Sequence, residues 1–435
     1  MWLKWVVGSP RQALGLLLYR WREISPLKKL RGLLFLNFLL TSALLRLLSV
    51  PLIYVLLVII GEVYVVNPLA ILLSSTYRNS IVFMTWAGAR RSRRPRRRID
   101  PLVEGIHSPC RHLYIPSPEG HHLGAWQLLP WNAAKPRGDS EEDWASVYAS
   151  HQPQLPVFLF LHGQGGHRGG RTRVGKCNML TGLGFHVLTF DYRGFGDSTG
   201  KPTPDGVVED VLTVYEWLRT RASPRPILFY AHSLGTGIAA RASQILFERG
   251  EGPLGFVLDS AFNTLTAVLW RHQLFTPYRA VPWMGRLLLS AFDKADQGFP
   301  SEEAIAAIGC QMLILHARDD PLIPYTLAEQ LKTAAEAANR RVHLELFSAD
   351  LGLGHNNVHD APNIPFILRK YLLSIGYSGE LLVPMTEEPT QVEEVEEDEP
   401  LTATPSRDKD DIMAASLSQD ALSQDDDEDD IFDED

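Results

Sequence analysis

Apolar residues fall into two arrangements along the chain. Between residues 101 and 379, short apolar runs alternate with longer amphipathic stretches. Uninterrupted runs of Val, Ile, Leu and Phe are typical of parallel strands buried on both faces, and the amphipathic stretches between them predict covering helices. The predicted strands are residues 112–116, 123–129, 157–162, 186–191, 227–231, 255–259, 311–316 and 342–347. The pattern therefore predicts an α/β domain with a mostly parallel sheet.

The second arrangement is a continuous apolar stretch before this domain. Residues 32–77 contain only two charged side chains, Arg46 and Glu62. About 20 residues cross a bilayer as a helix, so this stretch allows one long tilted span or two short spans that turn near Pro51. An arginine at the bilayer centre costs roughly 2.5–3.5 kcal/mol, which favours Arg46 at a segment end. We therefore predict an integral membrane protein.

Charge divides the chain further, although the net charge is only -9. Residues 1–100 carry 16 Lys/Arg and 3 Asp/Glu, and all of these Lys/Arg except Arg46 lie in a basic segment at 1–31 or a basic juxtamembrane linker at 78–100. Basic flanks favour the cytosolic side, so applying the rule to both flanks requires two spans, whereas a single span exports one flank. Because no nucleic-acid-binding module accompanies the arginines, we expect them to meet anionic lipid headgroups and expect no nucleic-acid partner.

The C-terminal residues have the opposite charge. Residues 384–435 carry 2 Lys/Arg and 21 Asp/Glu, with few aromatic side chains. Such a composition cannot bury enough apolar surface to fold alone. We expect 380–435 to be a disordered acidic tail, which is either solvated or binds a partner.

The sequence gives no sign of a metal or cofactor. Its three cysteines, Cys110, Cys177 and Cys310, are odd in number and far apart, which excludes a disulfide framework and a CxxC zinc site. A dinucleotide-binding fingerprint beginning at Gly163 requires a third glycine at position 168, where the chain has Arg168. We therefore expect neither a metal nor a cofactor.

Candidate chemistry lies at strand ends, where α/β proteins collect their functional residues. The strand at 227–231 runs into A-H-S-L-G-T-G, which places Ser233 between a strand and a helix. This context is typical of a nucleophile elbow, whose tight turn needs small residues two positions before and after the serine. Gly235 satisfies one position, and Ala231 adds one methyl group at the other. Ser233 is the candidate nucleophile.

A glycine-rich loop follows the strand at 157–162. Its sequence, HGQGGHRGG, covers residues 162–170. In this architecture, backbone N–H groups from such a loop and from the residue after the nucleophile bind a developing oxyanion. We assign these donors to Gln164 and Leu234.

Two further strand ends supply an acid and a base. Asp320 begins a D-x-x-I-P turn after the strand at 311–316, and His355 lies in a glycine-rich loop before the last predicted helix. Asp320 would orient the imidazole, and His355 would act as general base. Asp259 is the alternative acid and His359 the alternative base. Asp319, which precedes Asp320, is expected to be a solvated neighbour.

Five blocks of sequence resemble a known family. They are HGxxGxRGG, TFDYRGFGDSTG, AHSLGTG, LILHARDDPLIP and DLGLGH, and the resemblance as a whole covers residues 110–375. They resemble the lysophosphatidylserine lipase and monoacylglycerol lipase family, α/β-hydrolase domain-containing protein twelve and its relatives. The chain departs from this family at Ala231, at Gln164-Gly165, in the acidic tail and in having no N-x-S/T sequon.

The resemblance implies an α/β-hydrolase fold for residues 101–379. It also implies an integral membrane serine hydrolase of the endoplasmic reticulum that cleaves single-chain lipids, with its catalytic domain facing the lumen. The family's triad maps onto Ser233, Asp320 and His355. These are the same residues that the strand-end motifs select.

An insertion at residues 264–300 is predicted to form a lid. Its apolar side chains suit an acyl chain or the bilayer, although core packing of a cap helix would give the same pattern. These side chains are Trp270, Leu274, Phe275, Trp283, Met284, Leu287 and Leu288. Its arginines, Arg271, Arg279 and Arg286, suit anionic headgroups.

We predict a serine hydrolase that cleaves the acyl ester of a membrane lipid through an acyl-enzyme. Acyl transfer is an alternative, because His355 and Asp360 have the H-x4-D spacing of some lipid acyltransferases. The sequence is also compatible with a thioesterase on the same triad and with a non-catalytic membrane scaffold.

Overall fold

The computed structural model describes residues 52–87, 99–136, 138, 140–150, 155–223, 225–293 and 299–377. The predictions for the basic segment 1–31, for Arg46 and Pro51, and for the acidic tail 380–435 lie outside these residues. The arginine-rich run at residues 90–98 also lies outside them.

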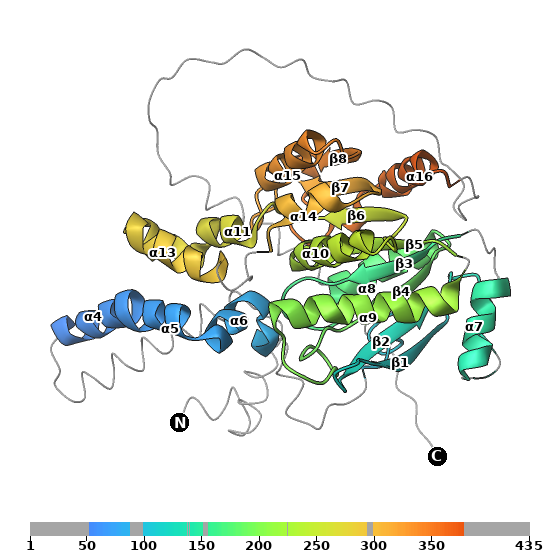
Figure 1. The fold of residues 1–435 in the computed structure, drawn as a ribbon, viewed down its shortest axis with the longest axis horizontal. Coiled ribbons are helices and arrows are strands. Elements are labelled where there is room, and N and C mark those ends of the chain that lie inside the picture. Colours follow the sequence, from blue (N-terminus) through green and yellow to red (C-terminus); the bar gives the residue numbers. More distant parts are fainter. Residues whose placement is uncertain are drawn as a thin grey trace, which may run out of the picture. The chain divides into compact units, whose positions relative to one another are not determined.

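All eight predicted strands are confirmed and form one sheet (Figure 1). The strand order is β1-β2-β4-β3-β5-β6-β7-β8; β1 and β2 are antiparallel to their neighbours and the other pairs are parallel. The strands are β1 Cys110–Pro116, β2 His122–Leu128, β3 Val157–Leu161, β4 His186–Phe190, β5 Ile227–His232, β6 Gly255–Asp259, β7 Gln311–Ala317 and β8 Val342–Phe347. Every residue of β3 to β6 is buried, as the continuous apolar runs require.

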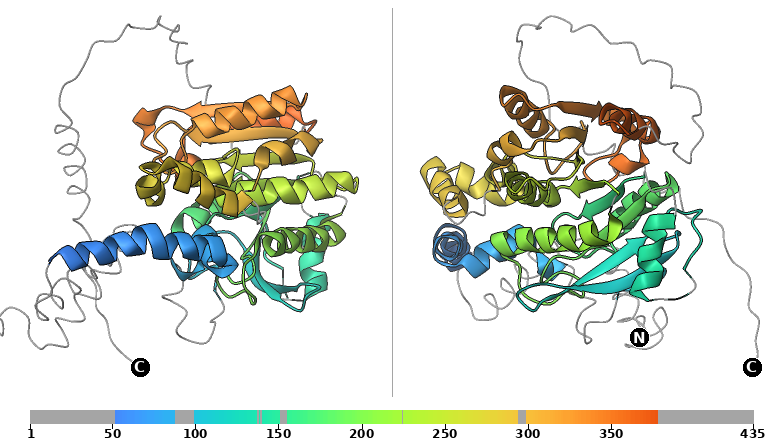
Figure 2. Two further views of the ribbon diagram at one scale, coloured as in Figure 1. Left: turned by 60° about the vertical axis from the view of Figure 1, so that its left-hand side comes forward. Right: turned by 45° about the vertical axis from the view of Figure 1, so that its right-hand side comes forward.

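Helices cover both faces of the sheet (Figures 1 and 2). Phe158 and Tyr230 pack in one apolar cluster with residues of α8 and α16, whereas Leu159 and Phe229 pack in the other with residues of α9, α10, α14 and α15. The alternation follows from the two-residue period of a strand. The helices are α7 Glu141–Ser150, α8 Arg171–Gly182, α9 Pro204–Ala222, α10 Leu234–Glu248, α14 Ser301–Ala307, α15 Thr326–Ala337 and α16 Ile364–Ser374.

The N-terminal helix is apolar and mostly exposed. It consists of α4 Leu52–Gly61, a π-helical turn at Glu62–Val66 and α5 Asn67–Leu73. Its 22 residues make it long and apolar enough to cross a membrane, by length and composition only. At 1.5 Å per residue the helix is about 33 Å long, which matches the hydrocarbon core of a bilayer.

The next helix differs from the sequence prediction. Residues 78–100 were predicted to be a linker, but 78–83 belong to α6 Ser75–Phe83, which starts after Ser74 caps the Tyr77 N–H at 3.1 Å. Val82 and Phe83, at the end of α6, are 1% and 0% exposed within the main apolar cluster. The sequence did not indicate this helical end within the range 78–100, because the two apolar residues stand just before the charge-rich run and their burial depends on distant parts of the chain.

The predicted lid forms three helices. They are α11 Leu265–Arg271, α12 Thr276–Arg279 and α13 Pro282–Asp293, with a 3₁₀ turn at Gln273–Phe275. Its apolar residues divide between two roles: Phe275 and Leu288 are buried, whereas Leu274, Trp283 and Leu287 are exposed.

The lid also contacts the apolar N-terminal helix. The Tyr64 hydroxyl donates to the Pro277 carbonyl at 3.3 Å, and the Tyr64 ring meets the Tyr278 ring edge-on at 6.4 Å between centroids. Helix α13 packs against α5 as well. The lid therefore lies against the one helix among the described residues that is both long and apolar enough to span a bilayer.

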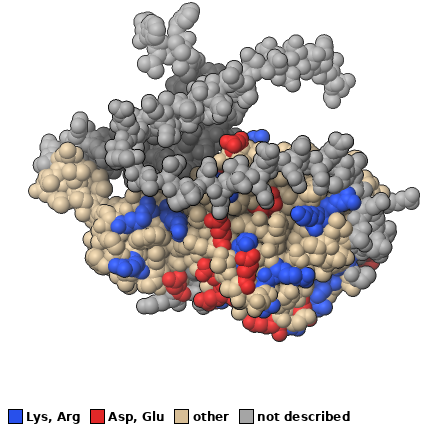
Figure 3. All heavy atoms as spheres, turned by 90° about the horizontal axis from the view of Figure 1, so that it is seen from above, with Lys and Arg blue, Asp and Glu red and all other residues tan. Residues whose placement is uncertain are grey.

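Surface charge on one face of the body is mixed in sign. Seen from above, acidic and basic side chains are interspersed over the described part of this face, with broad uncharged areas between them (Figure 3). A mixed surface of this kind produces no strong long-range field of one sign.

Candidate active site

Three predicted residues from distant parts of the chain meet at the carboxyl ends of β5, β7 and β8. His355 Nε2 lies 2.9 Å from Ser233 Oγ, and His355 Nδ1 lies 2.7 Å from Asp320 Oδ2. Because a carboxylate can only accept, Nδ1 carries the proton and Nε2 is left to accept from the serine hydroxyl. The three residues are 7–9% exposed. This is the geometry of a nucleophile, a base and an orienting acid.

The backbone at Ser233 has a strained conformation. Its backbone lies at φ 54° and ψ -125°, in the region that favours glycine, and its N–H donates to the Asp259 carbonyl at 2.9 Å. A side chain at Gly235 would collide with the carbonyl oxygens of Leu161 and His162. The glycine two positions after the serine is therefore sterically required, as the elbow motif predicts.

Asp320 is held in its ionised form. Burial alone would raise its pKa, but hydrogen bonds from His316 and His355 outweigh burial and hold the pKa well below its usual range. The backbone N–H groups of Leu322 and Ile323 donate to Oδ1 at 2.8 and 2.9 Å, which adds to this effect. The turn after β7 thus fixes a charged acid beside the imidazole.

The alternative acid and the alternative base have other partners. Asp259 forms a buried ion pair with Lys176 at 2.8 Å, and His359 Nε2 lies 3.4 Å from Asp360. Asp319 was predicted to be a solvated neighbour, but its Oδ2 accepts the Gly354 N–H at 2.9 Å and so anchors the loop that carries His355. The sequence could not show this contact, because the partner of the carboxylate is a backbone group.

The loop around His355 accepts hydrogen bonds from three side chains that the sequence did not predict. His232 Nε2 and Ser260 Oγ donate to the His355 carbonyl at 3.0 and 3.1 Å, and Lys176 Nζ donates to the Asn356 carbonyl at 2.7 Å. Burial and the nearby Lys176 lower the pKa of His232 to about 3, so this imidazole is neutral. The loop therefore holds its histidine through backbone carbonyls as well as through Asp320.

The glycine-rich loop lies directly beside the nucleophile. A Cβ atom on Gly163 would stand 3.0 Å from Ser233 Cβ. Among the described residues, no group accepts a hydrogen bond from the backbone N–H of Gln164 or Leu234. These two N–H groups are thus free to serve as the predicted oxyanion donors.

The side chain of Gln164 has a separate role. Its amide donates to the carbonyls of Ile81 and Val82 at 3.0 and 2.7 Å, and the Gly165 N–H donates to the Phe83 carbonyl at 3.0 Å. The loop is therefore tied to the C-terminal end of α6, and the side-chain amide of Gln164 is engaged there.

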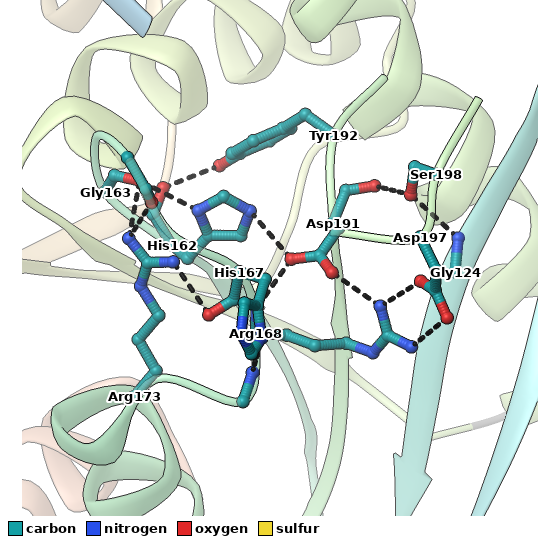
Figure 4. A network of polar contacts seen from close by, with 12 residues as sticks. Gly124, His162, Gly163, His167, Arg168, Arg173, Asp191, Tyr192, Asp197 and Ser198 are labelled. Atoms are coloured by element: carbon teal, nitrogen blue, oxygen red, sulfur yellow. Dashed lines mark hydrogen bonds and ion pairs between the residues drawn. The ribbon is translucent and has the colours of Figure 1, made fainter. Parts of the chain in front are cut away.

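A buried network of charged side chains joins the same loop to the segment after β4 (Figure 4). Arg168, which excluded a dinucleotide fingerprint, pairs with Asp191 and Asp197 at 2.5 and 2.6 Å. The Asp191 carboxylate also accepts the Arg168 backbone N–H, so the loop and the segment after β4 are joined twice. Because these buried charges are paired, they avoid the desolvation cost that an unpaired buried charge would carry.

Comparisons with known proteins agree with this geometry. Residues 156–299 match the family described as alpha/beta hydrolase fold. Lysophosphatidylserine lipase ABHD12 of Danio rerio is 36% identical over 279 residues, covering 62% of this chain and 72% of that protein. The chain belongs to the ABHD12 family. Protein ABHD12B of Homo sapiens is 33% identical over 264 residues, covering 60% of this chain and 72% of that protein.

The fold of this ABHD12-family chain also has a likeness among solved structures. The Pyrococcus furiosus esterase Pf2001 has 16% sequence identity and a TM-score of 0.47, covering 63% of this chain and 93% of that one. The ABHD12-family chain is a carboxylic-ester hydrolase of the α/β-hydrolase fold. In the part of the chain that the structure describes, no group of three or more His, Cys, Asp or Glu side chains is placed to hold a metal ion.

Proposed function

We propose that the chain hydrolyses the acyl ester of single-chain membrane lipids, such as a lysophospholipid or a monoacylglycerol, through an acyl-enzyme on Ser233. The observation that carries the chemistry is that His355 contacts both Ser233 Oγ and Asp320 Oδ2, at 2.9 and 2.7 Å. A serine hydroxyl is a weak nucleophile at neutral pH until such a base accepts its proton.

In the first step, Ser233 Oγ bonds to the ester carbonyl carbon while its proton moves to His355 Nε2. The carbonyl π electron pair moves to oxygen, where the N–H groups of Gln164 and Leu234 stabilise it. The tetrahedral intermediate then collapses, the bond to the headgroup oxygen breaks, and His355 returns the proton to that oxygen. The headgroup alcohol leaves and the acyl chain stays esterified to Ser233.

Water completes the reaction by the same route. Its oxygen bonds to the acyl carbon while one proton passes to His355 Nε2. The second intermediate collapses by breaking the bond to Ser233 Oγ, which recovers the proton from His355. The fatty acid is released, and throughout both steps the ionised Asp320 stabilises the transient imidazolium.

Three features support a lipid substrate. The curated relative from Danio rerio is named a lysophosphatidylserine lipase. The lid exposes Leu274, Trp283 and Leu287, which are apolar. The lid also contacts the apolar helix 52–73 through Tyr64 of its π-helical turn and through α5, so a substrate entering beside the lid would come from the bilayer if this helix spans one.

The proposal includes membrane anchorage through Leu52–Leu73, on the grounds of its length, composition and exposed side chains. The family resemblance supports residence in the endoplasmic reticulum membrane with the catalytic domain in the lumen. Protein partners form no part of the proposal.

Acyl transfer has less support than hydrolysis. The H-x4-D spacing was its sequence signal, but Asp360 is 64% exposed in its side chain and lies beside His359, whereas His355 is bonded to Asp320. The spacing therefore does not bring His355 and Asp360 together as a pair.

The test compares Ser233→Ala with wild type on lysophosphatidylserine, lysophosphatidylcholine and monoacylglycerol, with free fatty acid as the product measured. We expect the substitution to abolish fluorophosphonate labelling and to lower kcat by about 10⁴-fold or more, because only binding and oxyanion donors remain.

Ser146→Ala is the matched control, since Ser146 is exposed on α7 and its hydroxyl is bonded to the Asp143 carbonyl. This control should keep both labelling and activity. Full lipid cleavage by Ser233→Ala would reject the mechanism, and acyl product on an added alcohol in place of fatty acid would favour transfer.

A further inference from the structure

Arg173, on the first turn of α8, concentrates its hydrogen bonds on the glycine-rich loop (Figure 4). Its Nη2 donates to three consecutive backbone carbonyls at 3.0, 3.0 and 2.6 Å, those of Gly163, Gln164 and Gly165. Its Nη1 donates to the His167 carbonyl at 2.8 Å. One side chain therefore fixes the path of the loop that lies against Ser233.

The charge of Arg173 has no direct carboxylate partner among the described residues. The side chain is buried, and the nearby Asp191 is itself paired with Arg168. Burial lowers the pKa of Arg173 to about 10, which leaves the guanidinium protonated at neutral pH. Its positive charge is consequently directed at carbonyl dipoles instead of being neutralised by an anion.

One of these carbonyls belongs to the peptide group that supplies an expected oxyanion donor. The Gly163 carbonyl and the Gln164 N–H are opposite ends of the same planar peptide. This carbonyl accepts from Arg173 at 3.0 Å and from His162 Nδ1 at 2.8 Å. Burial holds the pKa of His162 well below normal, so His162 acts as a neutral donor and Arg173 contributes the charge.

A cation at a carbonyl oxygen draws electron density across the peptide resonance and makes the N–H at the other end a stronger donor. The contact between Arg173 and the Gly163 carbonyl is buried, where such polarisation is screened less than in water. The effect grows as negative charge develops on the substrate oxygen, and it is therefore larger in the transition state than in the ground state.

We propose that Arg173 is a positioning residue for catalysis, which fixes the glycine-rich loop and polarises the Gln164 N–H toward the oxyanion. This inference rests on the proposed serine mechanism. Arg173 does not touch the reacting atoms, and it acts through the Gly163–Gln164 peptide.

The experiment uses the full chain in detergent micelles and two variants, Arg173→Gln and Arg173→Lys. Fluorophosphonate labelling to completion counts reactive serines, so that kcat is expressed per labelled serine. An acyl trifluoromethyl ketone is the second probe: Ser233 Oγ adds to its carbonyl carbon, the proton passes to His355, and an oxyanion forms in the site.

We expect Arg173→Gln to lower kcat per labelled serine by about 10- to 100-fold, somewhat less than the loss of a whole oxyanion donor. The inhibition constant of the ketone should rise by the same factor, while KM stays within about twofold of wild type. Arg173→Lys keeps the cation but reaches fewer carbonyls, so its kcat and its ketone affinity should lie between those of wild type and Arg173→Gln.

If Arg173 had a purely structural role, the variants would show fewer labelled serines. The kcat per labelled serine and the affinity for the ketone would then stay unchanged. Arg171→Gln, which changes an exposed arginine at the start of the same helix, is the matched control and should match wild type in all three measurements. Thermal melting of each variant reports whether it folds.

Wild-type kcat per labelled serine together with wild-type ketone affinity, in either folded variant, would overturn the inference. Failure of both variants to fold would assign Arg173 to stability alone and would overturn it equally. The proposed function fails separately, if Ser233→Ala retains lipid cleavage. If Ser233→Ala is inactive while both Arg173 variants equal wild type, only the inference about Arg173 fails.

Discussion

At the scale of single residues, Asp320 connects the electrostatics of the site to pH. Its pKa is depressed in the folded chain, mainly because hydrogen bonds from His316 and His355 outweigh the effect of burial. The carboxylate therefore contributes stability that is present above its unfolded pKa of about 4 and is lost as the pH falls through the lower folded value.

Asp320→Asn should accordingly show two effects. We expect kcat to fall by about 10³- to 10⁴-fold, because a neutral amide no longer fixes the imidazole tautomer or stabilises its cation. The difference in melting temperature between wild type and variant should be largest near pH 7 and should shrink below about pH 4, where the stabilising effect of the wild-type carboxylate begins to be lost.

Steady-state kinetics and melting curves at pH 7 and pH 3.5 make this comparison. A melting difference that grew toward low pH would contradict the assignment of Asp320 as a charged group in the fold.

The residues that could be predicted from the sequence are those with a motif at a strand end. Ser233 has its glycine, Asp320 has its turn, and His355 has its glycine-rich loop. Arg173 and Lys176 were missed because their partners are backbone carbonyls or a remote carboxylate, which no residue pattern identifies. A signal was nevertheless present: both stand on the same stripe of α8 as the buried Cys177.

At the scale of elements, α8 supports two loops of the site, the glycine-rich loop and the loop that carries His355. Near its start Arg173 holds the glycine-rich loop, and one turn later Lys176 reaches the Asn356 carbonyl and the Asp259 carboxylate. Lys176 and Asp259 are both fully buried, so removing one leaves the other without compensation.

Lys176→Met is expected to destabilise the chain by about 3–5 kcal/mol, the cost of breaking a buried ion pair. It should also lower kcat, because the loop that carries His355 loses one of its donors. In the double variant Lys176→Met/Asp259→Asn much of the stability should return, since no uncompensated charge remains, but kcat should stay low.

Chemical unfolding and kinetics of the two single variants and the double variant form the required cycle. Recovery of full kcat in the double variant would show that Lys176 serves the ion pair alone and has no part in holding the loop.

The strands were the most predictable elements, because burial on both faces requires continuous apolar runs and such runs stand out from amphipathic helices. Helix α6 was the least predictable. Its buried residues, Val82 and Phe83, stand next to a run of arginines, and local sequence cannot show that a remote loop needs their carbonyls.

At the scale of the whole described molecule, α6 connects the apolar helix Leu52–Leu73 to the catalytic loop. The helix ends at Leu73, α6 begins at Ser75, and the last carbonyls of α6 hold Gln164 and Gly165. Removing the apolar helix and removing α6 should therefore have different effects.

Two truncated chains separate these effects. A chain that begins at residue 74 should leave the membrane fraction and keep kcat on a water-soluble short-chain ester within about twofold, because the oxyanion loop is intact. A chain that begins at residue 88 should lose at least about tenfold in kcat and also melt at a lower temperature, since the burial of Val82 and Phe83 contributes roughly 1.5–3 kcal/mol each.

Carbonate extraction, melting curves and kinetics per labelled serine provide the measurements. Equal activity of the two truncated chains would mean that α6 does not support the loop.

At position 233, where φ is positive, stability and catalysis favour different residues. Glycine adopts this conformation without a steric penalty, so a replacement that ends the reaction would also relieve the turn. A gene copy released from selection for turnover would thus have a favourable route toward glycine at this codon. The residue at position 233 would therefore indicate whether a duplicated gene still encodes an active enzyme.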